Sequence, residues 1–83
     1  MTLLEKILSQ KAALIDLFGE DSGPVSAIET QEKYIRIANH FTRLRDKGIK
    51  YEDAIQETCE TFHISQSTVK NALSTKKSLV NNI

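Results

Sequence analysis

The stretch AIQETCETFHISQSTVKNAL, residues 54–73, contains two short helical patterns on either side of a tight turn. In each half, apolar side chains recur every three or four residues, which is the spacing of one face of an α-helix. The first pattern extends back to residue 51, and the second begins after Ser65, a typical helix N-cap. We therefore expect one helix over residues 51–62 and a second helix that ends near Ser74.

The turn FHIS, residues 62–65, sets how these two helices meet. Two helices joined by three or four residues cross near 90–120° and need a small residue where they touch. Cys59 has the right size and position, so we expect it to be buried at the crossing. The residues expected to form the core of this motif are Ile55, Cys59, Phe62, Ile64, Val69, Ala72 and Leu73.

The second helix of the pair leaves a polar face outward. Its amide side chains can pair with N6 and N7 of adenine, and lysine can reach O6 or N7 of guanine in the major groove. No acidic residue follows Glu60, so this helix has no carboxylate to repel phosphate, although arginine, the commonest base-reading residue, is also missing from it. The candidate base-contacting residues are Gln66, Ser67, Lys70, Asn71 and Ser74.

This segment resembles the helix-turn-helix of bacterial DNA-binding proteins. The stretch ISQSTVKNAL, residues 64–73, is similar to the corresponding part of lactose-repressor-type regulators and of the promoter-reading domain of sigma factors. Cys59 matches the small residue of the family, Ser65 matches the cap of its recognition helix, and His63 departs from its usual glycine. The resemblance therefore implies a positive φ at His63, which costs a non-glycine residue roughly 1 kcal/mol. The resemblance implies that the second helix lies in the major groove of double-stranded DNA.

Residues 2–18 form another apolar pattern of helical period, and its apolar arc is wider than one core-facing stripe needs. A wide arc fits either a helix buried on a broad face or a helix with a second contact surface. Because one short recognition helix covers little DNA, we expect a second surface that joins two copies of the chain in a homodimer. The apolar residues concerned are Leu3, Leu4, Ile7, Leu8, Leu14, Ile15, Leu17 and Phe18.

A loop over residues 19–26 is indicated by two glycines and the only proline of the chain. Ser26 and Glu29 have the spacing of a capping box, and Thr30 is a competing cap. We therefore expect the next helix over residues 27–47.

The helix over 27–47 carries basic side chains on the face away from its apolar stripe, and Gly48 can close it in the left-handed conformation. Solvation explains such charges as well as contact with DNA phosphates does, and both interpretations stay open. On the DNA interpretation, the candidate backbone-contacting residues are Ser65, Lys76, Lys77, Lys33, Arg36, Arg43, Lys47 and Lys50.

The charge of the chain is zero overall but unevenly distributed. Its eleven basic and eleven acidic residues cancel. Residues 1–32 hold two basic against six acidic residues, whereas residues 33–83 hold nine basic against five acidic residues. The neutral total argues against a protein that coats nucleic acid nonspecifically, while the basic second part favours a local contact with phosphate.

Length and composition exclude several classes of protein. With 83 residues, we expect one domain with a thin core, too small for an elaborate enzyme or a deep cofactor cavity. The single cysteine allows no internal disulfide, and no cysteine or histidine spacing fits a zinc site. Charges interrupt the apolar N-terminal stretch, so it is neither a signal peptide nor a membrane span. We expect no metal, cofactor, small-molecule ligand or membrane contact, and a cytoplasmic location.

The sequence therefore predicts an all-α fold: a small four-helix domain, residues 1–83, with a C-terminal helix-turn-helix over 51–74 and a frayed tail or short extension over 75–83. The expected function is that of a transcription regulator or an accessory factor that binds double-stranded DNA. The alternative is a helical protein-interaction module that uses the N-terminal helix and keeps the helix-turn-helix as scaffold. The neutral total charge favours this alternative.

Overall fold

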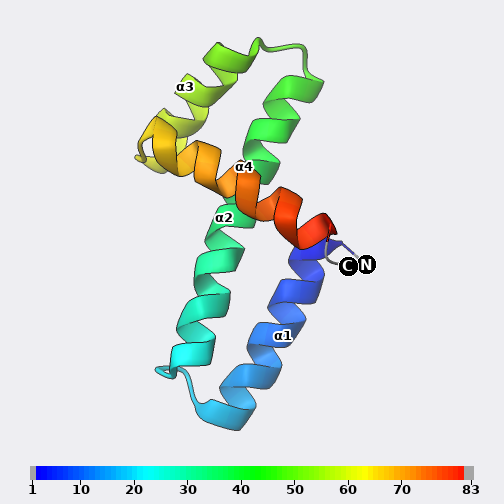
Figure 1. The fold of residues 1–83 in the computed structure, drawn as a ribbon, viewed down its shortest axis with the longest axis vertical. Helices are drawn as coiled ribbons and strands as arrows, with labels where there is room; N and C mark the ends of the chain where they lie inside the picture. The colour runs from blue at the N-terminus through cyan, green and yellow to red at the C-terminus, as the bar shows by residue number, and fades with distance from the viewer. Residues whose placement is uncertain (1, 82–83) are drawn as a thin grey trace. The chain divides into compact units, whose positions relative to one another are not determined.

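Four α-helices account for the regular structure of residues 2–81, which are the residues that the computed structural model describes. They are α1 (Leu3–Phe18), α2 (Gly23–Asp46), α3 (Tyr51–Phe62) and α4 (Gln66–Asn81), shown in Figure 1. No strand occurs within residues 2–81. The predicted all-helical architecture with four helices is confirmed.

The helices form two compact units, Met1–Lys33 and Tyr34–Ile83, and α2 contributes to both. The first unit contains α1 and the first part of α2. The second unit contains the rest of α2 together with α3 and α4, so it holds the whole of the segment that resembles a helix-turn-helix.

The first unit begins with a complete capping box. The hydroxyl of Thr2 accepts the backbone N–H of Glu5, and the carboxylate of Glu5 accepts the backbone N–H of Thr2 in return. Two amides that would otherwise lack a partner at the helix start are satisfied in this way. The helix therefore starts at Leu3, with Thr2 as its cap.

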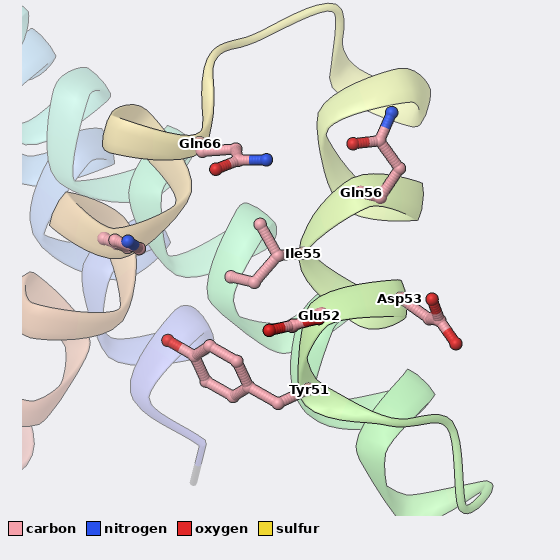
Figure 2. Close-up of a pocket in the computed structure, with 7 residues that line it drawn as sticks. Tyr51, Glu52, Asp53, Ile55, Gln56 and Gln66 are labelled. Carbon is pink, nitrogen blue, oxygen red and sulfur yellow. The ribbon is translucent and has the colours of Figure 1, made fainter.

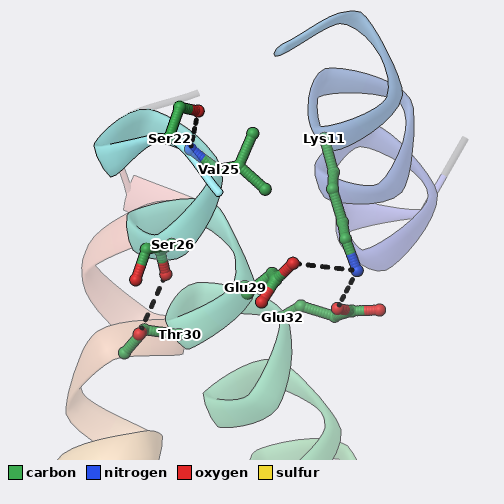
Figure 3. Close-up of polar contacts among 7 residues, drawn as sticks. All are labelled: Lys11, Ser22, Val25, Ser26, Glu29, Thr30 and Glu32. Carbon is green, nitrogen blue, oxygen red and sulfur yellow. Dashed lines mark hydrogen bonds and ion pairs between the residues drawn. The ribbon is translucent and has the colours of Figure 1, made fainter. Parts of the chain in front are cut away.

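Lys11 links α1 to α2 within the first unit. Its Nζ lies 3.2 Å from Oε2 of Glu32 and 3.8 Å from Oε1 of Glu29, as Figure 3 shows. The buried apolar side chains of this unit are Ile7, Val25 and Ile28. Ile7 is the one buried residue of α1, so most of the apolar arc of that helix is partly or fully exposed.

The second helix begins earlier than the sequence predicts, at Gly23 rather than at residue 27. Ser22 serves as its cap, because the Ser22 hydroxyl accepts the backbone N–H of Val25 at 3.4 Å (Figure 3). Proline is tolerated in the first turn, where backbone N–H groups have no partner within the helix. Pro24 is therefore part of the helix, and the loop before it is shorter than predicted.

The predicted capping box of Ser26 and Glu29 is wrong. Ser26 lies inside α2, where its carbonyl accepts the hydroxyl of Thr30 at 3.2 Å. Glu29 instead pairs with Lys11 of α1. The spacing of the two residues was that of a cap, but the helix had already started one turn earlier.

The second unit has one apolar core to which its three helices contribute. The buried cluster consists of Ile37, Phe41 and Leu44 from α2, Ala54 and Ile55 from α3, and Val69 and Ala72 from α4. Three of the predicted motif residues, Ile55, Val69 and Ala72, are buried in this cluster. The other four pack against it with partly exposed side chains: Cys59, Phe62, Ile64 and Leu73.

The prediction that Cys59 is buried at the helix crossing is wrong. Cys59 is half-buried, whereas its neighbour Thr58 is fully buried with no exposed surface. The Thr58 hydroxyl donates to the carbonyl of Ala54 at 2.7 Å, so its burial leaves no donor unsatisfied. The innermost side of α3 is therefore formed by Ala54, Ile55 and Thr58.

The turn between α3 and α4 has the predicted left-handed residue. His63 has φ 55° and ψ 49°, and it is the one non-glycine residue with positive φ in the described part of the chain. The backbone N–H of Ile64 donates to the carbonyl of Cys59 at 3.1 Å, which closes the end of α3. The chain is thus redirected into α4 within three residues.

The last helix is longer than predicted, because α4 runs to Asn81 instead of ending near Ser74. Residues 75–81, expected as a frayed tail or a short extension, continue the helix without a break, so the second of these alternatives describes them; residues 82–83 lie outside the described residues. Lys76 gives this extension a tertiary contact, since its Nζ donates to Oδ1 of Asn39 on α2 at 2.6 Å.

Candidate nucleic-acid interface

A continuous polar stripe covers the outward side of α4. All five predicted base-contacting residues are exposed: Gln66, Ser67, Lys70, Asn71 and Ser74. Val69 and Ala72 are buried in the core and fix this orientation of the helix. The exposed side chains of Lys77, Ser78 and Asn81 extend the stripe at the same three- and four-residue spacing. The stripe contains hydroxyl, amide and ammonium groups but no carboxylate.

Ser65 caps the start of α4, as the sequence predicts. Its hydroxyl oxygen accepts the backbone N–H of Thr68 at 3.3 Å and lies 3.1 Å from the Thr68 hydroxyl. The cap fixes the first turn of the helix, which is where the predicted contacts with bases begin. Ser65 itself is exposed, so its position is compatible with the predicted contact with the DNA backbone.

A groove separates the start of α4 from the start of α3. It has a volume of about 520 Å³ and is lined by Tyr51, Glu52, Asp53, Ile55, Gln56, Gln66 and Lys70. Figure 2 shows the Glu52 side chain pointing from α3 toward α4, and the Gln66 side chain pointing from α4 toward α3. Two of the predicted base-contacting residues therefore border a groove with a carboxylate on its other side.

Glu52 was missed by the sequence analysis as a neighbour of the polar stripe. From the sequence, Glu52 is interpreted as a residue that favours the start of a helix, because a carboxylate in the first turn interacts favourably with the helix dipole. The crossing of α3 and α4 additionally brings it to the groove that Gln66 and Lys70 border. No local sequence signal reports this proximity, which depends on the tertiary contact.

The predicted phosphate-contacting residues differ in their exposure and in the unit to which they belong. Those of the second unit that lie on or just after α2 are exposed: Arg36, Arg43, Lys47 and Lys50. On α4, Lys77 is exposed, but Lys76 is half-buried with its Nζ on Asn39. Lys33 is also exposed but belongs to the first unit. Lys77 is accordingly the better placed of the two neighbouring lysines for contact with phosphate.

The Lys76–Asn39 hydrogen bond brings two basic segments together. Arg36 and Arg43 stand three residues before and four residues after Asn39, so all three share one face of α2. Since α4 reaches that face through Lys76, the basic side chains of α2 and the C-terminal half of α4 belong to one region of the second unit.

The exposed side of α3 has the opposite charge. Its exposed carboxylates are Glu52, Asp53, Glu57 and Glu60. Any anionic ligand of the second unit is therefore directed to α4 and the end of α2 rather than to α3, because like charges repel.

His40 is the remaining notable polar side chain of the second unit. Its ring packs edge-on against Phe62, with the ring centres 5.4 Å apart. The Nε2 atom is buried and has no hydrogen-bond partner among the described residues. The ring is thus part of the packing between α2 and the end of α3.

The described residues offer little else that could act as a site. They contain no group of three or more His, Cys, Asp or Glu side chains able to hold a metal ion. Among them, no helix has the length and apolar character needed to cross a membrane. Comparisons with protein-family models, with curated proteins and with solved structures gave no match. A function must then follow from the arrangement of side chains described above.

Proposed function

We propose that this protein binds double-stranded DNA with α4 in the major groove, as a small transcription regulator or accessory DNA-binding factor. The observation that carries the proposal is the polar stripe of α4: exposed amide, hydroxyl and ammonium groups along one helix face, without a carboxylate. An α-helix fits the major groove, which is about 12 Å wide. The left-handed turn at His63 supports the proposal, because a helix-turn-helix also joins its two helices by a tight turn of three or four residues.

The side chains of the stripe and of the basic face of α2 have two kinds of role in this proposal. Gln66 and Asn71 carry the amides that pair bidentately with adenine, so they contribute sequence preference. Lys77 and Arg43 contact phosphates, which raises affinity for every sequence alike. Lys70 lies between Gln66 and Asn71 in the sequence and carries a positive charge, so it can serve either role.

A single helix in the major groove reads few base pairs, so the proposal includes association of two copies on neighbouring half-sites. The surface proposed for this association is the part of α1 that its unit does not cover. Leu17 and Phe18 are its most exposed apolar residues.

Binding to random duplex DNA at two salt concentrations tests this proposal. We expect binding at about 50 mM salt that weakens steeply toward about 200 mM, because each phosphate contact releases bound counterions. Lys77→Ala should weaken binding to all sequences and reduce the salt slope by about one. Asn71→Ala should instead relax the preference at particular base pairs by about 1–3 kcal/mol with an unchanged slope.

Lys6→Ala is the matched control, because it removes one lysine from α1 and leaves the second unit intact. It should leave the salt slope unchanged. The proposal fails if no DNA binds at about 50 mM salt, where electrostatic contacts are strong. It also fails if replacing Gln66, Lys70 and Asn71 together by alanine leaves binding unchanged.

A protein-interaction module is the second candidate function, and the exposed apolar residues of α1 favour it. Leu17 and Phe18 lie in solvent at 74% and 59% exposure, and such residues gather where a partner binds. In that case the second unit is scaffold, and the titration described above should detect no DNA binding even for the wild-type protein.

A further inference from the structure

Residues 16–21, DLFGED, form a segment that we call the acidic tip of α1. Its two apolar residues, Leu17 and Phe18, are 74% and 59% exposed, and its three carboxylates are exposed as well. No basic residue lies between Lys11 and Lys33 in the sequence, and Lys11 is paired with two other carboxylates. The tip thus combines uncovered apolar surface with negative charge that no neighbour in the sequence offsets.

Residues 77–80 form a segment that we call the basic end of α4, and it has the complementary character. Val80 is 51% exposed, and Lys77, one turn earlier on the same face, is exposed as well. Lys70 lies on this face two further turns back. Because residues 61–83 contain no acidic residue, no acidic side chain of this stretch reduces the positive charge around Val80.

A partner that covers the acidic tip has to offer apolar surface together with positive charge. A symmetric contact between two tips would bring six carboxylates together, which charge repulsion opposes. The basic end of α4 offers the required combination. We propose that the acidic tip of one copy docks on the basic end of α4 in the next copy, in a head-to-tail contact.

Such a contact uses two different surfaces on each copy, so a chain of copies grows unless it closes into a ring. The contact is small, because Leu17 and Phe18 of one copy meet Val80 of the next. Stable protein interfaces, in comparison, bury about 1,200 Å² or more. It is therefore weak in free solution and strengthened where copies are held close together. Because Lys77 is also a proposed phosphate contact, the docked tip and DNA should compete for it, and this last step alone rests on the proposed function.

Two variants of the full chain, each lacking one of the two surfaces, test the contact without DNA. Leu17→Ser with Phe18→Ser removes the apolar part of the acidic tip, and Val80→Ser removes that of the basic end. Sedimentation velocity of the wild-type protein should show an average mass that rises with concentration past that of a dimer, and that falls when salt is raised from about 50 to about 500 mM. Each variant should stay monomeric under the conditions in which the wild type associates.

The decisive sample is an equal mixture of the two variants. Because one variant keeps its basic end and the other keeps its acidic tip, the mixture should associate again but stop at a heterodimer. Ala12→Ser on α1 and Thr75→Ser on α4 are controls that should associate like the wild type, with circular dichroism confirming helix content.

The proposal is overturned if the wild type stays monomeric up to about 1 mM, a concentration that detects even contacts of about −4 kcal/mol. It is equally overturned if the mass levels off at a dimer that Val80→Ser leaves intact, or if the mixed variants fail to associate. None of these results bears on DNA binding, which is tested separately above.

Discussion

His63 holds the turn between α3 and α4 in a conformation that L-residues seldom adopt. At φ 55° and ψ 49°, its Cβ approaches the following carbonyl, which costs about 1–2 kcal/mol. Its side chain is exposed, so few contacts offset this cost. The fold accepts the strain because the apolar core on both sides of the turn, including Ile55 and Val69, fixes the direction of both helices.

We predict that His63→Gly stabilises the protein by about 0.5–1 kcal/mol, because glycine adopts positive φ without steric cost. Urea denaturation of the full chain measures the change. His63→Ala is the control: it removes the same imidazole but keeps the Cβ and its strain, so it should stay within about 0.5 kcal/mol of the wild type. A His63→Gly variant less stable than the wild type would mean that contacts of the imidazole outweigh the strain.

Residue types alone misplace the side chain at the helix crossing. Cys59 was assigned to the crossing because it is small and stands at the right distance from the turn, whereas threonine ranks among the residues that are mostly exposed. The threonine is nevertheless fully buried, because a helix supplies its hydroxyl with a carbonyl acceptor four residues earlier. His63 was predictable, since the family resemblance marks its position as one of positive φ.

At the scale of helices, periodicity predicted the existence of all four elements but not all of their ends. The end of α2 shortly before Gly48 and the start of α4 directly after Ser65 were predictable from local residue chemistry. The extension of α4 to Asn81 was not, because its support is the distant hydrogen bond between Lys76 and Asn39. A sequence without glycine or proline after Ser74 permits the extension but does not require it.

The start of α2 gives a prediction that distinguishes Ser22, which caps the helix, from Ser26, which lies inside it. Ser22→Ala should lower the free energy of unfolding by about 0.5–1 kcal/mol, because the N–H of Val25 loses its acceptor. Ser26→Ala should leave it within about 0.5 kcal/mol, since alanine is favoured inside a helix. Thermal or urea denaturation of both variants decides the matter. The opposite ranking would place the cap at Ser26 after all.

At the scale of the whole molecule, charge is divided between the two units rather than balanced within each. Met1–Lys33 has three basic and six acidic residues, and Tyr34–Ile83 has eight basic and five acidic residues. The sequence showed this division, but it did not show that Glu52 of α3 lies at the groove bordered by Gln66 and Lys70. Affinity for an anionic ligand depends on the charges within about one Debye length, roughly 10 Å at 0.1 M salt, and not on the total.

We therefore predict that Glu52→Gln tightens binding to random duplex DNA about 3- to 10-fold at about 50 mM salt, because it removes a carboxylate beside the polar stripe. The gain should shrink as salt rises, since the repulsion that it relieves is screened. Titration of fluorescently labelled DNA measures both effects. Circular dichroism should accompany it, because Glu52 also favours the helix dipole of α3 by about 0.3–1 kcal/mol.

Glu20→Gln is the matched control, because it changes the net charge of the chain by the same amount but lies in the first unit. If local charge in the second unit governs binding, Glu20→Gln should change the affinity less than about 2-fold at the same salt concentration, where screening is weakest. Equal gains from both variants would show that total charge, and not the face of α4, controls the attraction of DNA. An unchanged affinity for Glu52→Gln at low salt would place the DNA away from the groove and would argue against α4 as the helix that enters the major groove.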